Sequence, residues 1–215
     1  MISHPLFISF DGGEGVGKST QSKLLQERLP NLYPDLRFMF TREPGGTPFG
    51  GLIRSLILSE DAEKADANTM FGLFVADRAH HLSTVVLPAL NAGKVVISDR
   101  FVAATFAYQA YAMDGKISTE LFDQYYNELL ARPDLTILFD LSVEESQCRV
   151  AARRGEINHF DLQTSDFHRK LFEGYRKFAT DYHTQDNQVA LVDAAGDVET
   201  VHERIMDLLI PALCT

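Results

Sequence analysis

The stretch Gly12-Gly13-Glu14-Gly15-Val16-Gly17-Lys18-Ser19 decides the fold, because it matches the pattern G-x-x-x-x-G-K-S/T. An apolar run at 6–10 precedes it, and a helical pattern that Pro30 is expected to stop follows it. This order is typical of a phosphate-binding loop, since glycines let backbone N–H groups surround an anion and the helix N-terminus adds about half a positive charge. We therefore expect the stretch and Thr20 to bind a nucleoside triphosphate, with Lys18 at the β- and γ-phosphates and Ser19 holding Mg²⁺.

Short apolar runs alternate with longer amphipathic segments along the rest of the chain. The runs are nearly apolar throughout, as expected for strands covered on both faces, and lie at 6–10, 36–40, 95–98, 135–139 and 189–192. Helical patterns are expected at about 49–57, at 66–87 (ending before Pro88), from Ser118, from the Ser142/Glu145 capping box to about Arg154, at 167–182 and after the Asp197 cap. This alternation predicts an α/β protein of the P-loop NTPase type, with three layers: a five-stranded parallel sheet and helices on both of its faces.

Length and composition exclude several other classes of protein. A chain of 215 residues is expected to form a single domain, 1–215. Its net charge of −10 argues against nucleic acid or an anionic membrane as a partner. The first residues have no basic segment typical of a signal peptide, and Cys148 and Cys214 lack paired spacing. These features favour a cytoplasmic protein with reduced thiols.

Two further motifs follow predicted strands and therefore face the phosphate-binding loop, because ligands bind outside the carboxyl ends of parallel strands. The loop Thr41-Arg42-Glu43-Pro44-Gly45-Gly46-Thr47 follows the second strand. Asp99 follows the strand at 95–98 and has the position of a carboxylate that orients Mg²⁺ and its waters. The alternative for Asp99 is a helix N-cap for the segment that begins at Phe101.

These blocks resemble the thymidylate kinases. The resemblance rests on 41–47, 74–78 (FVADR), 99–101 (DRF), 107–109 (AYQ) and 153–156 (RRGE), in the family's order and over most of the chain. It implies transfer of the γ-phosphoryl group of ATP to dTMP, giving dTDP and ADP in dTTP synthesis. It also implies Mg²⁺ as cofactor and a homodimer.

The resemblance assigns the acceptor site to residues of this chain. Phe74 and Arg78 are one helical turn apart, and the resemblance implies that Phe74 stacks on thymine while Arg78 bonds to a base carbonyl. Arg42 and Arg100 would clamp the acceptor phosphate bidentately. The remaining substrate-binding residues implied are Glu43, Pro44, Thr105, Tyr108 and Gln109. The alternatives are core packing for Phe74 and Tyr108, a solvated face for Arg78, and surface ion pairs for both arginines of the clamp.

Catalysis is expected from Lys18, Arg100, Glu14 and one lid arginine. Glu14 is a carboxylate inside an anion-binding loop, and the resemblance places it near the acceptor's 3′-hydroxyl and a magnesium-bound water. The loop has no basic residue at its variable positions, and in the family such chains carry the neutralising arginine on a lid. Here the lid is expected at about 149–163, with Arg153 or Arg154 in that role, the alternative being a solvated helix end.

Some features depart from the family pattern, and other functions stay open. The segment Asn158-His159-Phe160-Asp161 places a histidine where an arginine is expected, and Ala104 replaces a small hydroxyl residue. Another nucleoside monophosphate kinase and a catalytically impaired relative are therefore alternatives, whereas a GTPase lacks its Asn-Lys-x-Asp reader. His80 and His81 are adjacent and do not suit a zinc site, so a structural or surface role is expected for both.

Overall fold

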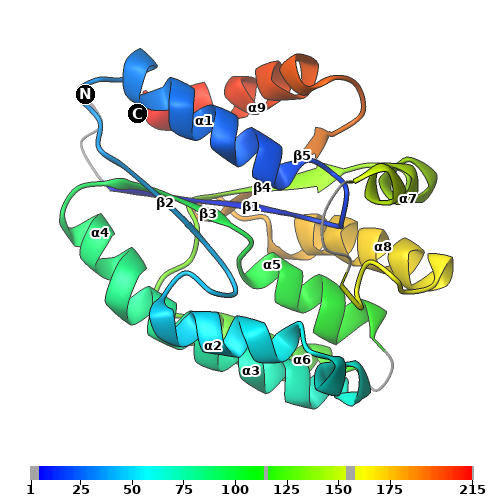
Figure 1. Ribbon diagram of the computed structural model, residues 1–215. Helices are drawn as coiled ribbons and strands as arrows, with labels where there is room; N and C mark the ends of the chain where they lie inside the picture. Colours follow the sequence, from blue (N-terminus) through cyan, green and yellow to red (C-terminus); the bar gives the residue numbers. More distant parts are fainter. Residues whose placement is uncertain (1–4, 114–115, 154–157, 215) are drawn as a thin grey trace.

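The protein is described by a computed structural model over residues 5–113, 116–153 and 158–214. Within these residues a five-stranded, all-parallel sheet has the order β2-β3-β1-β4-β5 (Figure 1). The strands are β1 (Leu6–Gly12), β2 (Phe38–Arg42), β3 (Val95–Asp99), β4 (Leu135–Asp140) and β5 (Gln188–Asp193). The predicted fold class is confirmed, although β2 begins two residues later than expected.

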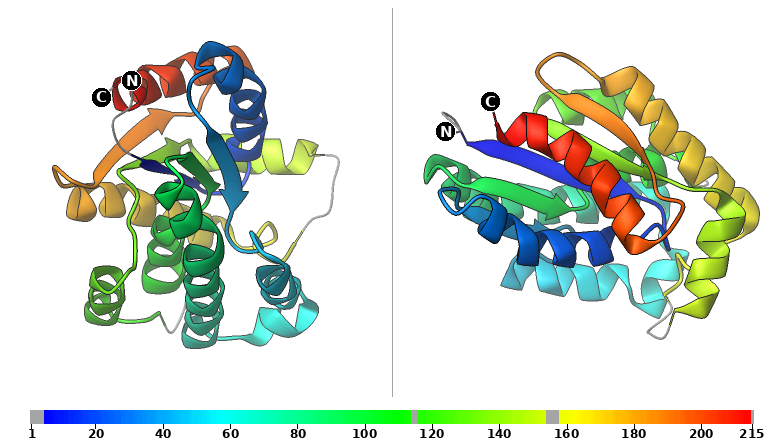
Figure 2. Two further views of the ribbon diagram at one scale, coloured as in Figure 1. Left: turned by 90° about the vertical axis from the view of Figure 1, so that its left-hand side faces the viewer. Right: turned by 90° about the horizontal axis from the view of Figure 1, so that it is seen from above.

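Helices cover both faces of the sheet. Helices α1 (Lys18–Leu32) and α9 (Val198–Leu213) lie together on one face, while the long helices α3 and α8 lie on the opposite side (Figures 1 and 2). The other helical elements are α2 (Pro48–Ile57), η1 (Glu60–Lys64), α3 (Ala67–His81), η2 (Leu82–Val86), α4 (Leu87–Asn91), α5 (Val102–Thr105), η3 (Phe106–Ala112), α6 (Thr119–Asn127), α7 (Val143–Ala152) and α8 (Ser165–Tyr182). The described helices include none with the length and apolar character needed to span a membrane.

The sheet separates two apolar cores. Along β1, Phe7 packs into the core beneath α3 and α8, whereas Ile8 and Phe10 pack beneath α1 and α9, as the two-residue period of a strand requires. The expectation of strands covered on both faces is right for the inner strands but wrong at the edges. In the edge strand β5, for example, Leu191 is 47% exposed, because the helices do not cover its side chain fully.

Proline does not end two helices where the sequence pattern predicted it would. After α3 the backbone stays helical through the π-helical turn η2 and on through α4, which contains Pro88. The wider turn accommodates the missing proline N–H, with Leu87 N–H donating to the carbonyl of Leu82. Helix α1 likewise continues two residues past Pro30, since a proline so near the end removes few hydrogen bonds.

The segment from α5 into the π-helical η3 was not predicted from the sequence. Its residues, VAATFAYQAYA, are apolar on nearly every side, so no amphipathic stripe marks a helix. Almost all of them are buried between the sheet and α8. This buried segment carries three of the expected acceptor-site residues.

The strand register brings the expected functional residues to one edge of the sheet. Asp99 at the end of β3 lies opposite Phe10 in β1 and Arg42 in β2. Gly12 at the end of β1 lies opposite Phe139 in β4. The phosphate-binding loop therefore lies at the middle of the sheet, with the ends of β2 and β3 on one side and that of β4 on the other.

Candidate functional site

The loop between β1 and α1 has the glycine conformations that the motif requires. Gly15 and Gly17 have φ of 70° and 93°, a region that disfavours residues with a Cβ. A Cβ on Gly15 would also lie 2.6 Å from the carbonyl oxygen of Ser146 in α7. Val16 packs its side chain into the core, so only its backbone faces the loop's concave side. Helix α1 then begins at Lys18, with its first N–H groups directed at the loop.

Lys18 lies folded back on this loop. Its Nζ donates to the carbonyl oxygens of Gly12 at 2.9 Å and Gly13 at 2.6 Å. Burial, reinforced by the nearby Arg100 cation, lowers the pKa of Lys18 to about 7. The Asp99, Glu14 and Asp11 carboxylates act in the opposite direction but do not outweigh these two effects.

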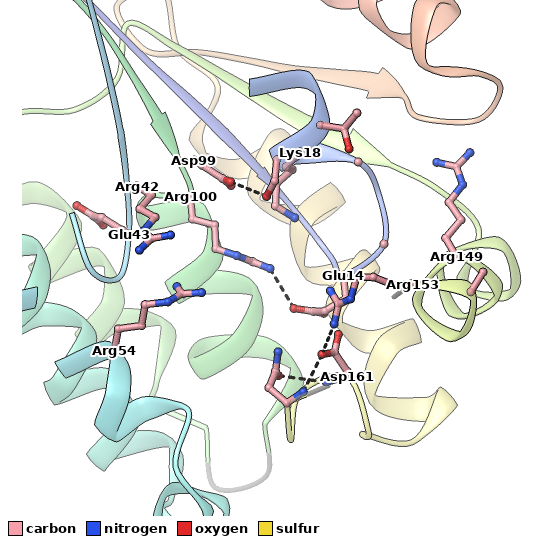
Figure 3. Close-up of a pocket in the computed structure, with 16 residues that line it drawn as sticks. Glu14, Lys18, Arg42, Glu43, Arg54, Asp99, Arg100, Arg149, Arg153 and Asp161 are labelled. Carbon is pink, nitrogen blue, oxygen red and sulfur yellow. Dashed lines mark hydrogen bonds and ion pairs between the residues drawn. The ribbon is translucent and has the colours of Figure 1, made fainter. Parts of the chain in front are cut away.

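Ser19 and Asp99, the two expected metal ligands, are adjacent. The Ser19 hydroxyl donates to Asp99 Oδ2 at 3.0 Å, and both side chains border the same pocket as Lys18 (Figure 3). The described residues contain no cluster of three or more His, Cys, Asp or Glu suited to a metal. One carboxylate and one hydroxyl beside a phosphate loop fit Mg²⁺, which keeps several waters and takes its other oxygens from phosphate. The alternative of an N-cap is wrong, because the cap residue of α5 is Phe101.

Arg100 has a backbone conformation rare for any residue except glycine, with φ of 74°. Its N–H donates to Phe10 O and its carbonyl accepts from the Ser98 hydroxyl, both at 2.8 Å. The buried Asp11 carboxylate accepts from the N–H groups of Phe101 and Ala104, each at 3.1 Å. Neighbouring elements therefore hold the strained turn, and such strain is typical of functional sites. Asp11, whose pKa is raised by burial, was missed by sequence reasoning.

The side chains of Arg100, Glu14 and Tyr108 form one network. The guanidinium of Arg100 lies 3.0 Å from Glu14 Oε1 and 5.5 Å from the centre of the Tyr108 ring. The Tyr108 hydroxyl donates to the same carboxylate oxygen. Burial favours a higher pKa for Glu14, but the Arg100 and Lys18 cations outweigh it and the pKa is lowered. Glu14 is therefore an ionised carboxylate. Its ion pair with Arg100 leaves 22% of the Arg100 side chain exposed.

A pocket of about 560 Å³ extends from the phosphate loop (Figure 3). Six cationic and four carboxylate side chains border it, a local positive excess in a chain of net charge −10. The cations are Lys18, Arg42, Arg54, Arg100, Arg149 and Arg153, and Thr20 also lies on its rim. Arg42, Arg54 and Arg100 lie on one side of the opening and Arg149 and Arg153 on the other. An anionic ligand can thus be held from both sides.

Sequence reasoning missed Arg54, although it is the one charged residue of α2. Its guanidinium donates to the carbonyl of Pro44 at 3.2 Å. The side chain lies across Gly45, where a Cβ would be 2.9 Å from Arg54 Cδ. Burial, followed by repulsion from the Arg42 and Arg100 cations, lowers the pKa of Arg54. The position of Arg54 could have been noticed in the sequence, because the predicted helix at about 49–57 directly follows the Arg42 loop.

A smaller cavity of about 100 Å³ shares part of this lining. Four residues border both cavities: Glu14, Arg54, Arg100 and Asn158. The smaller cavity alone is lined by Pro44, Ile57, Leu58, Phe74, Ala104, Tyr108 and Phe160. Flat and apolar side chains therefore line a slot next to the cationic pocket. Phe74 is only partly buried, so the alternative of plain core packing does not describe it fully.

Arg78, Glu43 and Thr105 form a buried polar network next to residues of this slot, since Arg78 is one helical turn from Phe74 and Thr105 follows Ala104. Arg78 is 1% exposed, so the alternative of a solvated face is wrong. Its Nε donates to Glu43 at 2.7 Å and its Nη2 to Thr105 Oγ1 at 3.0 Å. Gln109 is also buried, and its Oε1 has no hydrogen-bond partner within the described residues. Thr105 and Gln109 belong to the same buried segment as Ala104 and Tyr108, which line the slot.

The expected lid borders the pocket on its far side. Arg149 donates to the carbonyls of Ala194 at 3.0 Å and Gly196 at 3.3 Å. Arg153 ends α7 and pairs with Asp161 at 2.7 Å. Arg154 lies outside the described residues. His159 borders a different cavity together with Met70 and Phe167, so it does not replace the arginine that the family pattern would place in the site.

The chain is similar in sequence and in structure to known thymidylate kinases. Residues 10–205 match the family model described as thymidylate kinase. A thymidylate kinase of Bradyrhizobium sp. (strain ORS 278) is 36% identical over 97% of this chain and 91% of its own length. One of Bradyrhizobium diazoefficiens is 40% identical, over 94% of this chain and 88% of its own length. A crystal structure of thymidylate kinase from Ehrlichia chaffeensis superposes with a TM-score of 0.73 at 29% identity, covering 96% of this chain and 98% of that one.

Proposed function

This chain belongs to the thymidylate kinase family, and on that premise we propose that it transfers the γ-phosphoryl group of ATP to dTMP, giving dTDP and ADP for dTTP synthesis. One observation carries the proposal: a cationic pocket at the phosphate loop adjoins a slot lined by aromatic and apolar side chains. The first suits the phosphates of two nucleotides and the second a pyrimidine. The test is a coupled assay of ADP formation from ATP across the nucleoside monophosphates, and fastest turnover with another acceptor would contradict it.

The donor site is assigned to the loop from Gly12 to Thr20. Its backbone N–H groups and the start of α1 would surround the phosphates of ATP, and Lys18 would turn from its carbonyl partners toward the β- and γ-phosphates. Ser19 and Asp99 would hold Mg²⁺, which when bound supplies positive charge at the phosphate oxygens. Arg149 lies beside the loop after β5, where it can border the rest of ATP.

The acceptor site is assigned to the opposite side of the pocket. Arg42, Arg54 and Arg100 converge there and suit the dTMP phosphate, since guanidinium groups match phosphate oxygens bidentately. Phe74 in the slot would stack on thymine, and Tyr108 with Glu14 would lie at the sugar. A single 5-methyl group is worth about 0.8 kcal/mol in such a slot, so dUMP should be a poorer substrate than dTMP but not an excluded one.

Phosphoryl transfer at this site needs no strong general base. A dTMP phosphate oxygen, already anionic, forms the new bond to the γ-phosphorus while the bond from that phosphorus to the β–γ bridging oxygen breaks and leaves ADP. Lys18, Arg100 and Arg153 then have one task, which is to hold the two nucleotides in line and neutralise the charge on the moving group.

The segment at about 149–163 is proposed to act as the lid. The Arg153–Asp161 pair joins the end of α7 to the segment before α8, and both side chains border the pocket. Such a cover would exclude water, which otherwise competes with dTMP as acceptor. We also propose a cytoplasmic location, with which two unpaired cysteines, both exposed, are compatible.

The proposed homodimer is assigned to the outer face of α2 and α3. Phe49, Leu52 and Leu56 of α2 are 49%, 72% and 48% exposed, and Gly72 and Ala76 of α3 are exposed beside them. Arg54 is the one charged residue of α2, and its side chain borders the cationic pocket. Two chains of net charge −10 can meet there about a two-fold axis with the least repulsion.

A charge placed on this face should separate the two copies. Leu52→Glu is expected to give a monomer by sedimentation at concentrations where the unmodified chain is a dimer, because two buried carboxylates would face each other near the axis. Leu191→Glu, at an exposed position of the edge strand β5, is the control and should leave the dimer unchanged. A monomeric unmodified chain, or equal behaviour of both variants, would remove this assignment.

Binding of ATP should be accompanied by proton uptake above neutral pH. The pKa of Lys18 is about 7 without a ligand, against an ordinary value of 10.5, so most of Lys18 is neutral at pH 8.5. Phosphate oxygens at Nζ favour the charged form and raise that pKa again. Calorimetry at pH 8.5 in two buffers of different ionisation enthalpy should show uptake approaching one proton per site, falling at pH 6. The same proton count at both pH values would contradict the assignment of Lys18.

A further inference from the structure

We propose that His81 is a positioning residue for the acceptor site: it fixes the Glu43 carboxylate, which in turn fixes Arg78, one helical turn from Phe74 of the base slot. This inference rests on the proposed function. His81 is the last residue of α3, and its side chain is 0% exposed. A buried histidine on the face of α3 that carries Arg78 suggests plain packing, but its hydrogen bonds indicate a more specific role.

Both ring nitrogens of His81 have a partner close to the loop after β2. Nδ1 lies 2.8 Å from Glu43 Oε1, and Nε2 lies 2.7 Å from Thr41 Oγ1. An ionised carboxylate only accepts, so Nδ1 carries the hydrogen in the Glu43 bond. The ring also supports the loop from below, since a Cβ on Gly46 would lie 2.7 Å from Nε2.

Glu43 connects His81 to Arg78. Its second oxygen, Oε2, accepts from Arg78 Nε at 2.7 Å, so the two carboxylate oxygens are held from two points of the same helix. Glu43 is 3% exposed, which leaves little freedom for water to replace either partner. The carboxylate therefore cannot rotate without losing a charged hydrogen bond.

Arg78 has one donor left for a ligand. Of its five N–H groups, Nε serves Glu43, Nη1 serves the Tyr125 hydroxyl at 3.1 Å, and Nη2 serves both Phe101 O and Thr105 Oγ1. Within the described residues these four bonds leave one Nη1 hydrogen. The direction of that hydrogen depends on the plane of the Arg78 guanidinium, and among the described residues Glu43 is the one charged group that pairs with Arg78. His81 thus acts on the base through Glu43 and Arg78.

The test compares two variants that each keep one of the two histidine bonds. In asparagine the amide nitrogen Nδ2 is as many bonds from Cα as Nδ1 is in histidine. In glutamine the amide nitrogen Nε2 is as many bonds from Cα as Nε2 is in histidine. His81→Asn therefore keeps the Glu43 bond, and His81→Gln keeps the Thr41 bond. A role in packing alone would make both variants equally poor, whereas the proposed role separates them.

We expect His81→Gln to raise the KM and the Kd for dTMP about ten-fold, with the KM for ATP unchanged. His81→Asn should stay within about two-fold of the unmodified chain. Arg78→Ala, measured in parallel, shows the loss when the base contact itself is removed. His183→Gln is the control, because this exposed histidine follows α8 and borders neither cavity. Thermal unfolding of each variant confirms that the folded chains are compared.

Equal dTMP parameters in the two His81 variants, or a loss that affects ATP as much as dTMP, would overturn the inference while leaving the proposed function intact. Absence of dTMP turnover in the unmodified chain would instead overturn the proposed function, and the inference with it.

Discussion

Replacing Lys18 by methionine should lower the rate of phosphoryl transfer by about three orders of magnitude or more. Methionine has a similar length and fits the 7% exposed position, so the substitution removes the charge without leaving a cavity. Lys18 is the sole cation on the loop itself and would lie between the donor phosphates and the moving group. The measurement is kcat in the coupled ADP assay, with saturating ATP and dTMP.

Lys23→Met is the matched control for this prediction. It makes the same replacement on the same helix, but Lys23 is exposed and does not border the pocket. Its turnover should equal that of the unmodified chain. Near-normal transfer by Lys18→Met, with Lys23→Met also normal, would contradict the assignment of the loop as the donor site. Loss in both would indicate a general effect on α1 instead.

Replacing Arg100 by alanine should lower kcat by about two to three orders of magnitude, or about 3–4 kcal/mol of transition-state stabilisation. The guanidinium borders both cavities and is the described cation closest to Glu14. Its loss removes charge from the place where the two nucleotides would meet. It also leaves the Glu14 carboxylate without its nearest cation, so the pKa of Glu14 should rise.

Arg100→Gly separates the side chain of Arg100 from its backbone. Alanine at φ of 74° retains the backbone strain that glycine relieves. In denaturant titrations, the free energy of unfolding of Arg100→Gly should therefore be about 1 kcal/mol larger than that of Arg100→Ala. Its kcat should be equally low. If glycine restored turnover, the effect of the alanine variant would come from the backbone, and the role given to the guanidinium would be wrong.

The fold could be predicted because its signals are local. A phosphate-loop motif between a buried run and a helix, followed by strand–helix alternation, leaves few arrangements other than a parallel sheet. The segment Val102–Ala112 could not be predicted, since a helix buried all round has no polar face to give it a period. The continuation through Pro88 depends on a π-helical turn in which the hydroxyls of Ser83 and Thr84 donate to the carbonyl of His80, a tertiary detail with no sequence pattern.

The candidate site could be predicted where residues follow strands directly. Arg42, Asp99 and Arg100 come at strand ends, and the structure brings all three to the pocket of Lys18. Arg54 and Asp11 were missed because their positions depend on how α2 and α5 pack against those strand ends. Sequence motifs also gave no sign that Glu43 would be shared between Arg78 and His81, since this requires three residues from two elements to be buried together.

ATP and dTMP are expected to meet end to end across one cationic pocket, with thymine in the slot beside α3. A crystal structure with dTMP and a non-hydrolysable ATP analogue tests it most directly. We expect the triphosphate at the loop from Gly12 to Thr20, the thymine ring on Phe74 and the dTMP phosphate among Arg42, Arg54 and Arg100. Thymine bound away from Phe74, or the two phosphate chains in separate pockets, would contradict it.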